Sequence, residues 1–292
     1  EIFMTIKIQN KKYEVNKGDE LFKDKFTSRP LSEFTKPKAF PFKSKDYSSY
    51  SRENLIDRIL EHKKWRHHHN IEELKKNGDL YDAYVNRVEG MLASIDKFLI
   101  DCKIDTSEMR ACDLAAAEGF VANYFLENGK IKSCDLYELA EVNLERINLI
   151  QSLKKIKNSK SFRIDFDYVN WSSEIPKYDL VFCLGIVYHI ESPILFLRNL
   201  YAMTKKIAIV ESDTPLLNDS FRGNGAFFLN RDQVTLSRGN VRYLTEMRPN
   251  RKALIESLLT VGFKEVYTLE EHEKIKSKYF TTGEKSILVA IK

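Results

Sequence analysis

Residues 112–120, CDLAAAEGF, have the spacing of small side chains that a nucleotide-binding loop requires. The small residues at alternate positions after Asp113 are Ala115, Ala117 and Gly119. Nucleotide loops usually place glycine at such positions because the backbone passes close to the ligand, and alanine can replace it if its φ angle stays negative. Gly119 also precedes a helix-forming run whose free amide groups would favour a carboxylate or phosphate. Taken alone, the segment is equally compatible with the beginning of a helix that packs tightly against a sheet.

Acidic residues near the ends of the next two predicted strands could hold the sugar and base of a nucleoside. Glu138 lies 25 positions after Asp113 and directly before a predicted helix, so its carboxylate could accept hydrogen bonds from both ribose hydroxyls. Asp135 is the competing candidate, although it would lie within the strand, and acids are common at helix N-termini without any ligand. The following strand ends in IDFDYVNW, which offers Asp165 and Asp167.

A histidine in KYDLVFCLGIVYHIESP, residues 177–193, could act as a general base. His189 follows a predicted strand at the carboxyl edge of the sheet, and imidazole titrates near neutrality, so this residue could take a proton from a hydroxyl. Tyr188 is the second candidate. The competing interpretation is that His189 only supports its loop by hydrogen bonding.

Three consecutive histidines at 67–69 raise the question of a metal ion. Adjacent residues cannot all face one site, and a metal needs two or more ligands on one face together with a carboxylate. We therefore predict no metal site. One histidine of the run can reach a pocket while the others are solvated, and we assign His69 to substrate binding.

These residues must be positioned by strands and helices that alternate along the second part of the chain. Short strand candidates lie at 110–114, 131–137, 162–166, 180–184 and 207–210. The helix signals between and after them include Pro193 at the beginning of 193–203, and Asn250 and Gly262 on either side of 251–261. Two last strands, 266–269 and 286–291, would finish the sheet in antiparallel fashion. This alternation predicts an α/β fold with a mostly parallel sheet of seven strands, the last one antiparallel.

A different pattern precedes the sheet. Residues 11–50 have no sustained period and should form an irregular arm, and two amphipathic helices follow, for which Ser51 and Asp79 can act as N-caps. We therefore divide the chain into an N-terminal arm and helical extension, residues 1–105, and a larger domain, residues 106–292.

Residues 212–247 separate the fifth strand from the following helix by a connection far longer than usual. Long insertions at the ligand edge of a sheet are commonly lids, although a solvated surface loop is equally compatible with the pattern. The charged residues in and beside it that we assign to substrate binding are Glu211, Arg222 and Arg248, and Glu246 is a further polar candidate.

Composition narrows the class of protein. The formal charge of +5 over 292 residues is mild and does not by itself imply nucleic acid. No apolar run reaches about 18 residues, so neither a membrane span nor a secretory signal is indicated and we expect a cytoplasmic protein. The 4 cysteines lack metal-ligand spacing and are expected to be free thiols.

From residue 109 onward the sequence resembles the class I S-adenosylmethionine-dependent methyltransferases, in the order of the loop, the acids and the segment around His189. Within that family, VFCLGIVYHIESPILFLRNLYAMTKKIAIVES and MRPNRKALIESLLTVGF are similar to the branch of the tRNA wobble-uridine carboxymethyltransferases and related O-methyltransferases of sugars and secondary metabolites. WRHHHNI, residues 65–71, is similar to a Trp-x-His element of that branch. The resemblance implies a Rossmann-like methyltransferase sheet that binds S-adenosyl-L-methionine.

The resemblance also implies roles for single residues. Two alanines replace glycines of the D-x-G-x-G-x-G loop around the methionine part of the cofactor, Glu138 matches the ribose-binding acid, and Asp167 with Tyr168 matches the position that receives the adenine amino group. The residues assigned to cofactor binding are Asp113, Ala115, Ala117, Gly119, Phe120, Glu138, Asp167, Tyr168, Leu184 and Gly185.

Three functions are compatible with these features. The first is methylation of a small molecule, in which an oxygen of the acceptor attacks the methyl group and His189 acts as the base. The second is transfer of a methyl or carboxymethyl group to tRNA, favoured by basic clusters at 63–66 and 154–157, which are also typical of solvated helix faces. The third is cofactor binding without catalysis. A basic side chain inside the pocket would favour a carboxylated cofactor.

Overall fold

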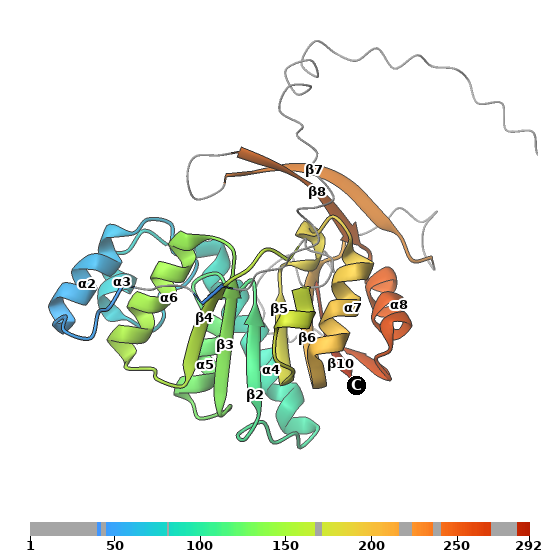
Figure 1. Ribbon diagram of the computed structural model, residues 1–292, viewed down its shortest axis with the longest axis horizontal. Helices are drawn as coiled ribbons and strands as arrows, with labels where there is room; N and C mark the ends of the chain where they lie inside the picture. The colour runs from blue at the N-terminus through green and yellow to red at the C-terminus, as the bar shows by residue number, and fades with distance from the viewer. Residues whose placement is uncertain are drawn as a thin grey trace, which may run out of the picture.

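The computed structural model describes residues 40–41, 45–80, 82–166, 171–215, 224–235, 241–269 and 285–292, and its centre is one twisted sheet (Figure 1). The strands of this sheet are β1 (Phe40–Pro41), β2 (Arg110–Leu114), β3 (Ser133–Glu138), β4 (Ser159–Arg163), β5 (Tyr178–Leu184), β6 (Thr204–Asp213), β9 (Glu265–Thr268) and β10 (Lys285–Ile291). Their order is β1-β4-β3-β2-β5-β6-β10-β9. Strands β2 to β6 are parallel, and β10 is antiparallel to both of its neighbours. The predicted seven-strand sheet with an antiparallel last strand is confirmed, and the two-residue strand β1 extends it at one edge.

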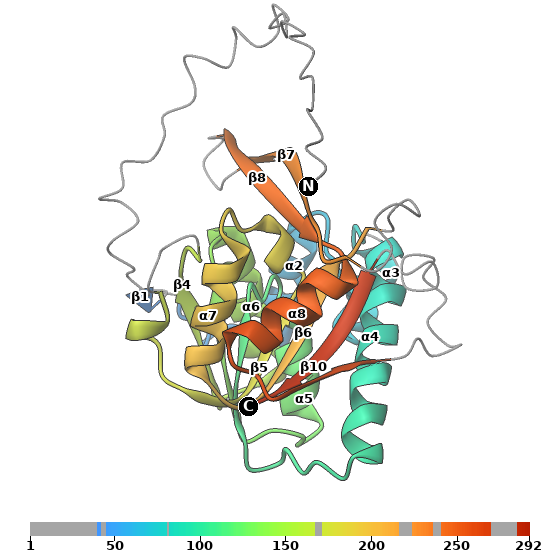
Figure 2. The ribbon, with the colours of Figure 1, turned by 90° about the vertical axis from the view of Figure 1, so that its right-hand side faces the viewer.

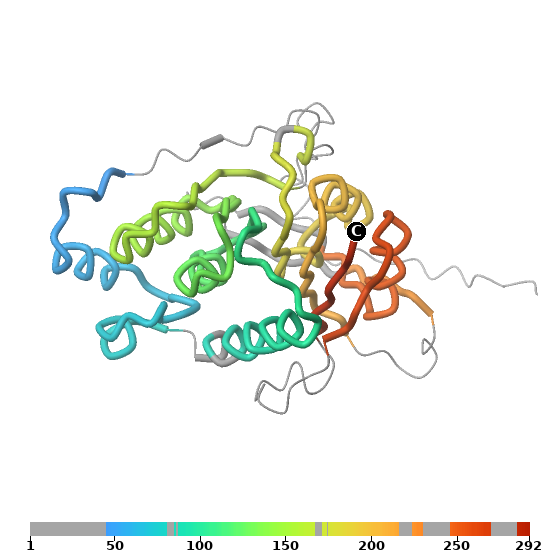
Figure 3. The backbone as a smooth tube through the Cα atoms, turned by 90° about the horizontal axis from the view of Figure 1, so that it is seen from below, coloured from blue at the N-terminus to red at the C-terminus, as the bar shows by residue number. Residues whose placement is uncertain are grey.

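Helices cover both faces of the sheet, because successive side chains of each strand point to opposite sides. The helices are α2 (Arg52–Glu61), α3 (Glu72–Asn77), α4 (Asp82–Asp101), α5 (Phe120–Glu127), α6 (Glu141–Lys154), α7 (Pro193–Met203) and α8 (Arg251–Val261), with short 3-10 turns η2 (Trp171–Glu174) and η3 (Val187–His189). One core cluster joins α4, α5 and α6 to one face, and another joins α7 and α8 to the opposite face (Figure 3). No helix among the described residues is long and apolar enough to cross a membrane.

The segment before the sheet packs on α6. Side chains of α2 and α3, together with Trp65, form a third core cluster with Leu149 and Ile150 of α6. In Figure 1 α2 and α3 lie beside α6, at the outer edge of the molecule. The short helix α3 escaped the sequence pattern because its 6 residues are too few to show a period.

Helix ends were predicted with unequal success. The side chains of Ser51 and Asn250 cap α2 and α8 as expected, by accepting backbone N–H groups of Asn54 and Ala253. The expected cap by Asp79 is wrong, since α4 begins at Asp82. The carbonyl of Asp79 instead accepts the N–H of Trp65 at 2.8 Å. This bond joins the two ends of the segment between α2 and α4.

Strands β7 (Phe227–Thr235) and β8 (Val241–Pro249) form a separate antiparallel hairpin within the 212–247 insertion and its flank. Figures 1 and 2 show it standing beyond the carboxyl ends of the parallel strands. The base of the hairpin packs against η3, which directly follows β5. A connection without periodicity in the sequence is therefore a hairpin at the ligand edge of the sheet.

Candidate functional site

The loop between β2 and α5 turns through three residues with positive φ. The φ angle is 55° at Ala115, 48° at Ala117 and 73° at Gly119. The condition that the two alanines keep a negative φ is therefore wrong, and both adopt the left-handed conformation that glycine adopts without cost. For other residues this conformation costs about 1–2 kcal/mol. The loop keeps the backbone shape of a glycine-rich loop although two glycines are missing.

Gly119 has no room for a side chain. A Cβ at this position would lie 2.8 Å from Leu136 Cδ2 and 3.1 Å from Ile147 Cγ1, both in the core under α5. The absence of a side chain lets the N-terminus of α5 approach β3 closely, as the third glycine of nucleotide loops does. The sequence retains glycine at the one loop position where space as well as φ requires it.

Glu138 at the end of β3 holds the loop from below. Its Oε2 accepts the N–H of Ala117 at 2.8 Å, and its Oε1 accepts those of Leu139 and Ala140, each at 2.9 Å. Burial raises the pKa of this carboxyl, and the three backbone donors oppose that rise. A carboxylate has about four acceptor directions, so about one is left for a ligand hydroxyl.

Asp135, the competing acid, lies elsewhere. It sits in the middle of β3, where it accepts the hydroxyl of Tyr178 at 2.6 Å and pairs with Arg110 at 3.2 Å. These contacts belong to the amino-terminal half of the strand. Glu138, and not Asp135, lies beside the loop.

Asp113 is buried beneath the loop, with 3% of its surface exposed. Burial raises its pKa to about 8, while a hydrogen bond from the backbone amide of Ala122 in the first turn of α5 lowers it in part. The carboxyl group is therefore largely protonated at neutral pH. Its role in the structure is to join the end of β2 to the beginning of α5.

A second polar cluster lies beyond the ends of β5 and β6. Nδ1 of His189, in η3, lies 2.8 Å from Oε1 of Glu246 in β8. Glu246 is 1% exposed, and its other oxygen accepts two guanidinium bonds from Arg248, at 2.7 and 3.0 Å. The hairpin thus supplies a buried carboxylate that contacts the histidine, and a cation that holds this carboxylate in place.

The same cluster continues into the sheet through Lys285 at the beginning of β10. Its ammonium group pairs with Asp213 and lies 3.2 Å from Glu211 Oε1 and 5.2 Å from the ring centre of Tyr188. The side chains of Lys285 and Glu211 are 7% and 2% exposed. This chain of alternating charges extends from Glu211 through Lys285, Asp213, Arg248 and Glu246 to His189.

The end of β5 connects the two regions. Leu184 is the last residue of β5, and the N–H of Gly185 donates to the carbonyl of Glu211 at 3.0 Å. A Cβ at Gly185 would lie 3.3 Å from Oε2 of Glu211 and 3.6 Å from the Tyr188 hydroxyl. Gly185 also has a positive φ of 78°, so a side chain here would crowd the polar cluster.

His67 and His69 pack against Phe120, the first residue of α5. His67 stacks on Phe120 with ring centres 3.4 Å apart, and His69 is fully buried between Trp65 and Phe120. Both belong to the wall that supports α5. Burial lowers the pKa of His67 to about 2, which keeps its ring neutral.

His67, His68 and Glu89 form a group whose ligand atoms lie within 4.8 Å of one another. Nδ1 of each ring accepts a backbone N–H, from His69 at 2.8 Å and Asn70 at 3.0 Å, so each neutral ring carries its proton on Nε2. The two Nε2 atoms face Glu89 at 3.4 Å. Protonated Nε2 atoms have no lone pair for a metal ion, so this tautomer disfavours a metal site here.

Some residues that the sequence assigned to the site lie outside the described part of the chain, and one strand lies earlier than predicted. Asp167, Tyr168 and Arg222 fall outside the described residues. Asp165 is half-buried just after β4, which spans 159–163 rather than the predicted 162–166. The 4 cysteines are free thiols, as predicted.

Three participants were missed by sequence reasoning: Glu118 inside the loop, Asp213 and Lys285. Glu118 had a local signal, an acid next to the retained glycine. Asp213 and Lys285 had none, because their pairing depends on the antiparallel register of β6 and β10, 72 residues apart in the chain.

Comparison with known proteins agrees with this architecture. A family model described as a methyltransferase domain matches residues 58–264. The N-terminal domain of EvdMO1, solved in the presence of S-adenosylhomocysteine (SAH) and D-fucose, is 17% identical with a TM-score of 0.56 over 85% of this chain and 98% of that chain. The same domain with SAH bound gives 16%, 0.54, 85% and 98%, and complete EvdMO1 gives 18%, 0.50, 85% and 49%.

No curated protein matches the sequence. The likeness to EvdMO1 shows the fold, and the resemblance to the tRNA-modifying branch stays a prediction. The family match covers well over half of the chain and includes the loop, Glu138 and His189. The chain therefore belongs to the methyltransferase domain family and is a class I S-adenosylmethionine-dependent methyltransferase.

Proposed function

We propose that this enzyme methylates a hydroxyl group of a small molecule, with His189 as the general base. The observation that carries the proposal is the 2.8 Å contact between His189 Nδ1 and the buried carboxylate of Glu246. A carboxylate beside one ring nitrogen favours a histidine that takes a proton from a hydroxyl with the other nitrogen. The presence of D-fucose, a hydroxylated sugar, with the similar EvdMO1 domain supports the substrate class.

The cofactor-binding half consists of the loop, Glu138 and the end of β5. Ala115, Ala117 and Gly119, at alternate positions of the loop, all have positive φ. This backbone shape allows the close approach that the methionine part of the cofactor needs, so the residues present fit the cofactor. Glu138 would hold a ribose hydroxyl with its remaining acceptor direction, and Leu184 and Gly185 would line the pocket. Asp167 and Tyr168 remain the proposed adenine contacts.

Bound S-adenosylmethionine supplies an activated methyl group, so the protein has to position the acceptor and remove its proton. Because Nδ1 is the nitrogen that lies beside the Glu246 carboxylate, Nε2 of His189 is the nitrogen that would take the hydroxyl proton. The acceptor oxygen forms the new bond to the methyl carbon, the sulfur to methyl bond breaks, and SAH leaves. Glu246 stabilises the imidazolium that forms, while Arg248 keeps that carboxylate from moving.

The charges of the cluster favour a neutral, hydroxylated acceptor. Within the described residues, Lys285 and Arg248 are each already paired with carboxylates, which argues against a cation reserved for a carboxymethyl group. Glu211 would accept a hydrogen bond from a hydroxyl of the acceptor molecule, and Arg248 would donate one. The β7–β8 hairpin would act as a lid, because it contributes Glu246 and Arg248 from beyond the sheet edge.

The test is a methyl-transfer assay on a panel of hydroxylated acceptors, D-fucose included, with wild-type enzyme and His189→Ala. We expect the variant to lose about 10²- to 10⁴-fold in kcat, the usual contribution of general base catalysis, with unchanged SAH affinity. Unchanged kcat in His189→Ala would exclude the histidine as the base.

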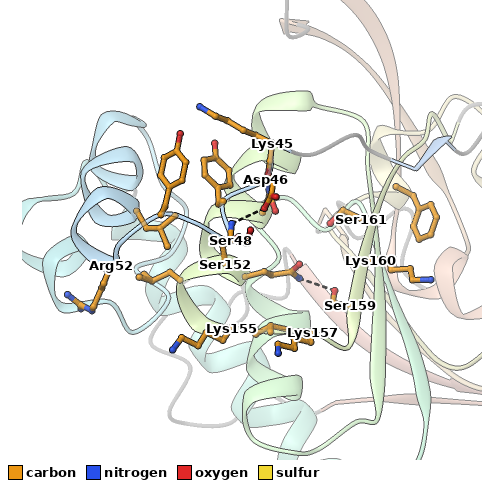
Figure 4. Close-up of a pocket in the computed structure, with 18 residues that line it drawn as sticks. Lys45, Asp46, Ser48, Arg52, Ser152, Lys155, Lys157, Ser159, Lys160 and Ser161 are labelled. Atoms are coloured by element: carbon orange, nitrogen blue, oxygen red, sulfur yellow. Dashed lines mark hydrogen bonds between the residues drawn. The ribbon is translucent and has the colours of Figure 1, made fainter.

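A nucleic-acid substrate is the second candidate, favoured by a groove at the β4 edge with a volume of about 1190 Å³ (Figure 4). Exposed Lys155, Lys157 and Lys160 lie along it, and Lys45 stands over the rings of Tyr47 and Tyr50 on the opposite side. Cations beside aromatic rings suit a single strand with phosphates.

Reversal of the three groove lysines to glutamate separates the two candidates. If RNA is the substrate, oligonucleotide binding weakens and its salt slope falls by about one per lost phosphate contact. A matched triple reversal at exposed Lys76, Lys103 and Lys206 controls for net charge. Methylation of small acceptors that is indifferent to both sets would favour the first function.

A further inference from the structure

The carboxylate of Glu118, inside the cofactor loop, fastens that loop to the segment before the sheet. It is 2% exposed and accepts the backbone N–H of Arg66 on both oxygens, at 2.8 and 2.9 Å, and that of His67 at 3.3 Å. Nε2 of His69 lies 3.8 Å away. The loop therefore reaches more than 50 residues back along the chain through one side chain.

Arg146 of α6 completes this contact from the other side. Its guanidinium donates to Glu118 at 2.8 Å and to the carbonyl of Lys63, and it lies 5.0 Å from the ring centre of Trp65. We call this buried pair, with the backbone groups of residues 63–67 that it binds, the Glu118–Arg146 clamp. It joins the cofactor loop, α6 and the N-terminal segment at one point.

A buried ion pair is weak evidence for a contribution to stability, because desolvation offsets much of its attraction. The strained loop gives the pair another role. Ala115 and Ala117 occupy a conformation that L-residues other than glycine avoid, and such strain persists only where the surroundings enforce it. The clamp acts on the residue directly after Ala117, and Glu138 holds the N–H of Ala117 itself.

We propose that the Glu118–Arg146 clamp holds the two alanines in their left-handed conformation, which makes Glu118 a positioning residue for cofactor binding. The clamp replaces what two glycines supply by their own freedom, and it makes residues 63–69 part of the cofactor-binding device. The inference rests on the proposed assignment of the loop to the cofactor. It explains why an acid stands directly before the retained Gly119.

The test is a double-mutant cycle on SAH affinity, measured by calorimetry. Glu118→Gln is made in the wild-type loop and in a loop that carries Ala115→Gly with Ala117→Gly. We expect a loss of about tenfold or more in the alanine loop and of less than about threefold in the glycine loop, because glycine keeps positive φ without help. At saturating cofactor, kcat of Glu118→Gln should stay within about twofold of wild type, so that the effect appears in KM.

Equal losses in both loops would overturn the inference, since Glu118 would then act without regard to the strain. Glu89→Gln, which removes a half-exposed carboxylate facing the same histidine run, is the matched control and should leave SAH affinity unchanged. If Glu118→Gln does not fold, Arg146→Lys enters the same cycle with the same two results. Lysine at this position keeps the positive charge but cannot bond to both Glu118 and the carbonyl of Lys63 as the guanidinium does.

A further variant separates this inference from the assignment on which it rests. Gly119→Ala should abolish SAH binding if the loop is the cofactor site. Unchanged affinity in Gly119→Ala would refute the loop assignment, whereas lost affinity together with equal losses in the cycle would refute the clamp alone.

Discussion

The two halves of the site hold their carboxylates in different ways. At the loop, Glu138 accepts three backbone N–H groups and Glu118 accepts two backbone N–H groups with one guanidinium. Beyond β5 and β6, Glu246, Glu211 and Asp213 are instead paired with side-chain cations and a histidine. The first half is fixed mainly by backbone N–H groups, and the second by ion pairs among β6, β8 and β10, which are far apart in the chain.

This difference fits two tasks. A cofactor with a constant shape is best bound by a rigid backbone, whose donors and acceptors do not move. An acceptor that must be deprotonated needs side chains that can exchange charge, which is the role we propose for His189 and Glu246. The comparison therefore predicts that changes at the loop affect affinity, and that changes at the cluster affect turnover.

The largest effect is expected from Gly119→Ala. The added Cβ would meet Leu136 at 2.8 Å and the positive φ would add strain, so SAH affinity should fall about a hundredfold or more. Gly129→Ala is the control, because Gly129 also has a positive φ, 62°, but a Cβ there meets nothing within 4 Å. Calorimetry should show normal SAH affinity for Gly129→Ala. A similar loss in both variants would show that SAH binding does not depend specifically on Gly119.

Glu246→Gln should have the next largest effect, on turnover rather than affinity. The amide can still fill the space between His189 and Arg248, but it cannot stabilise an imidazolium, so kcat should fall by about 10²-fold. Single-turnover methyl transfer with saturating cofactor measures this directly. A rise in KM for the cofactor at constant kcat would show that Glu246 serves cofactor binding and not turnover.

The protonated carboxyl of Asp113 should appear in the pH dependence of stability. Its pKa rises from 3.8 to about 8 on folding, so between those values the folded state holds a proton that the unfolded state has lost. This contribution to stability is complete below about pH 4 and is lost as pH rises through about 8. Asp113→Asn should remove this slope, and urea unfolding from pH 4 to 8 measures it. A variant that loses stability with pH as steeply as wild type would contradict the buried, protonated state.

The smallest effect is expected from Ala115→Gly. Relief of left-handed strain, partly offset by the greater freedom of glycine in the unfolded chain, should stabilise the protein by at most about 1 kcal/mol. Chemical denaturation of the variant beside wild type measures it. Destabilisation by more than about 1 kcal/mol would mean that the methyl group's packing under the loop outweighs the strain.

The loop half could be predicted from the sequence because its parts are local. The spacing of Asp113, the small residues and Gly119, and the distance to Glu138, follow from a strand, a tight turn and a helix in succession. Within the loop, the contacts of Glu118 were missed and the sign of φ at the alanines was mispredicted. Propensity favours negative φ, and the clamp that overrides it comes from residues 63–67 and α6.

The cluster half could be predicted only in fragments. His189 was proposed because it follows a buried strand, and Glu246 and Arg248 because the insertion is rich in charge. Their pairing depends on how the hairpin packs on η3, and the place of Lys285 depends on sheet register across the chain. Neither arrangement leaves a local period or spacing in the sequence.

The division between the two halves is tested most directly by calorimetric titration of SAH into Glu138→Ala and His189→Ala. The account predicts that Glu138→Ala loses most of its SAH affinity while His189→Ala binds SAH as wild type does. Wild-type affinity in Glu138→Ala, or a comparable loss in His189→Ala, would contradict it.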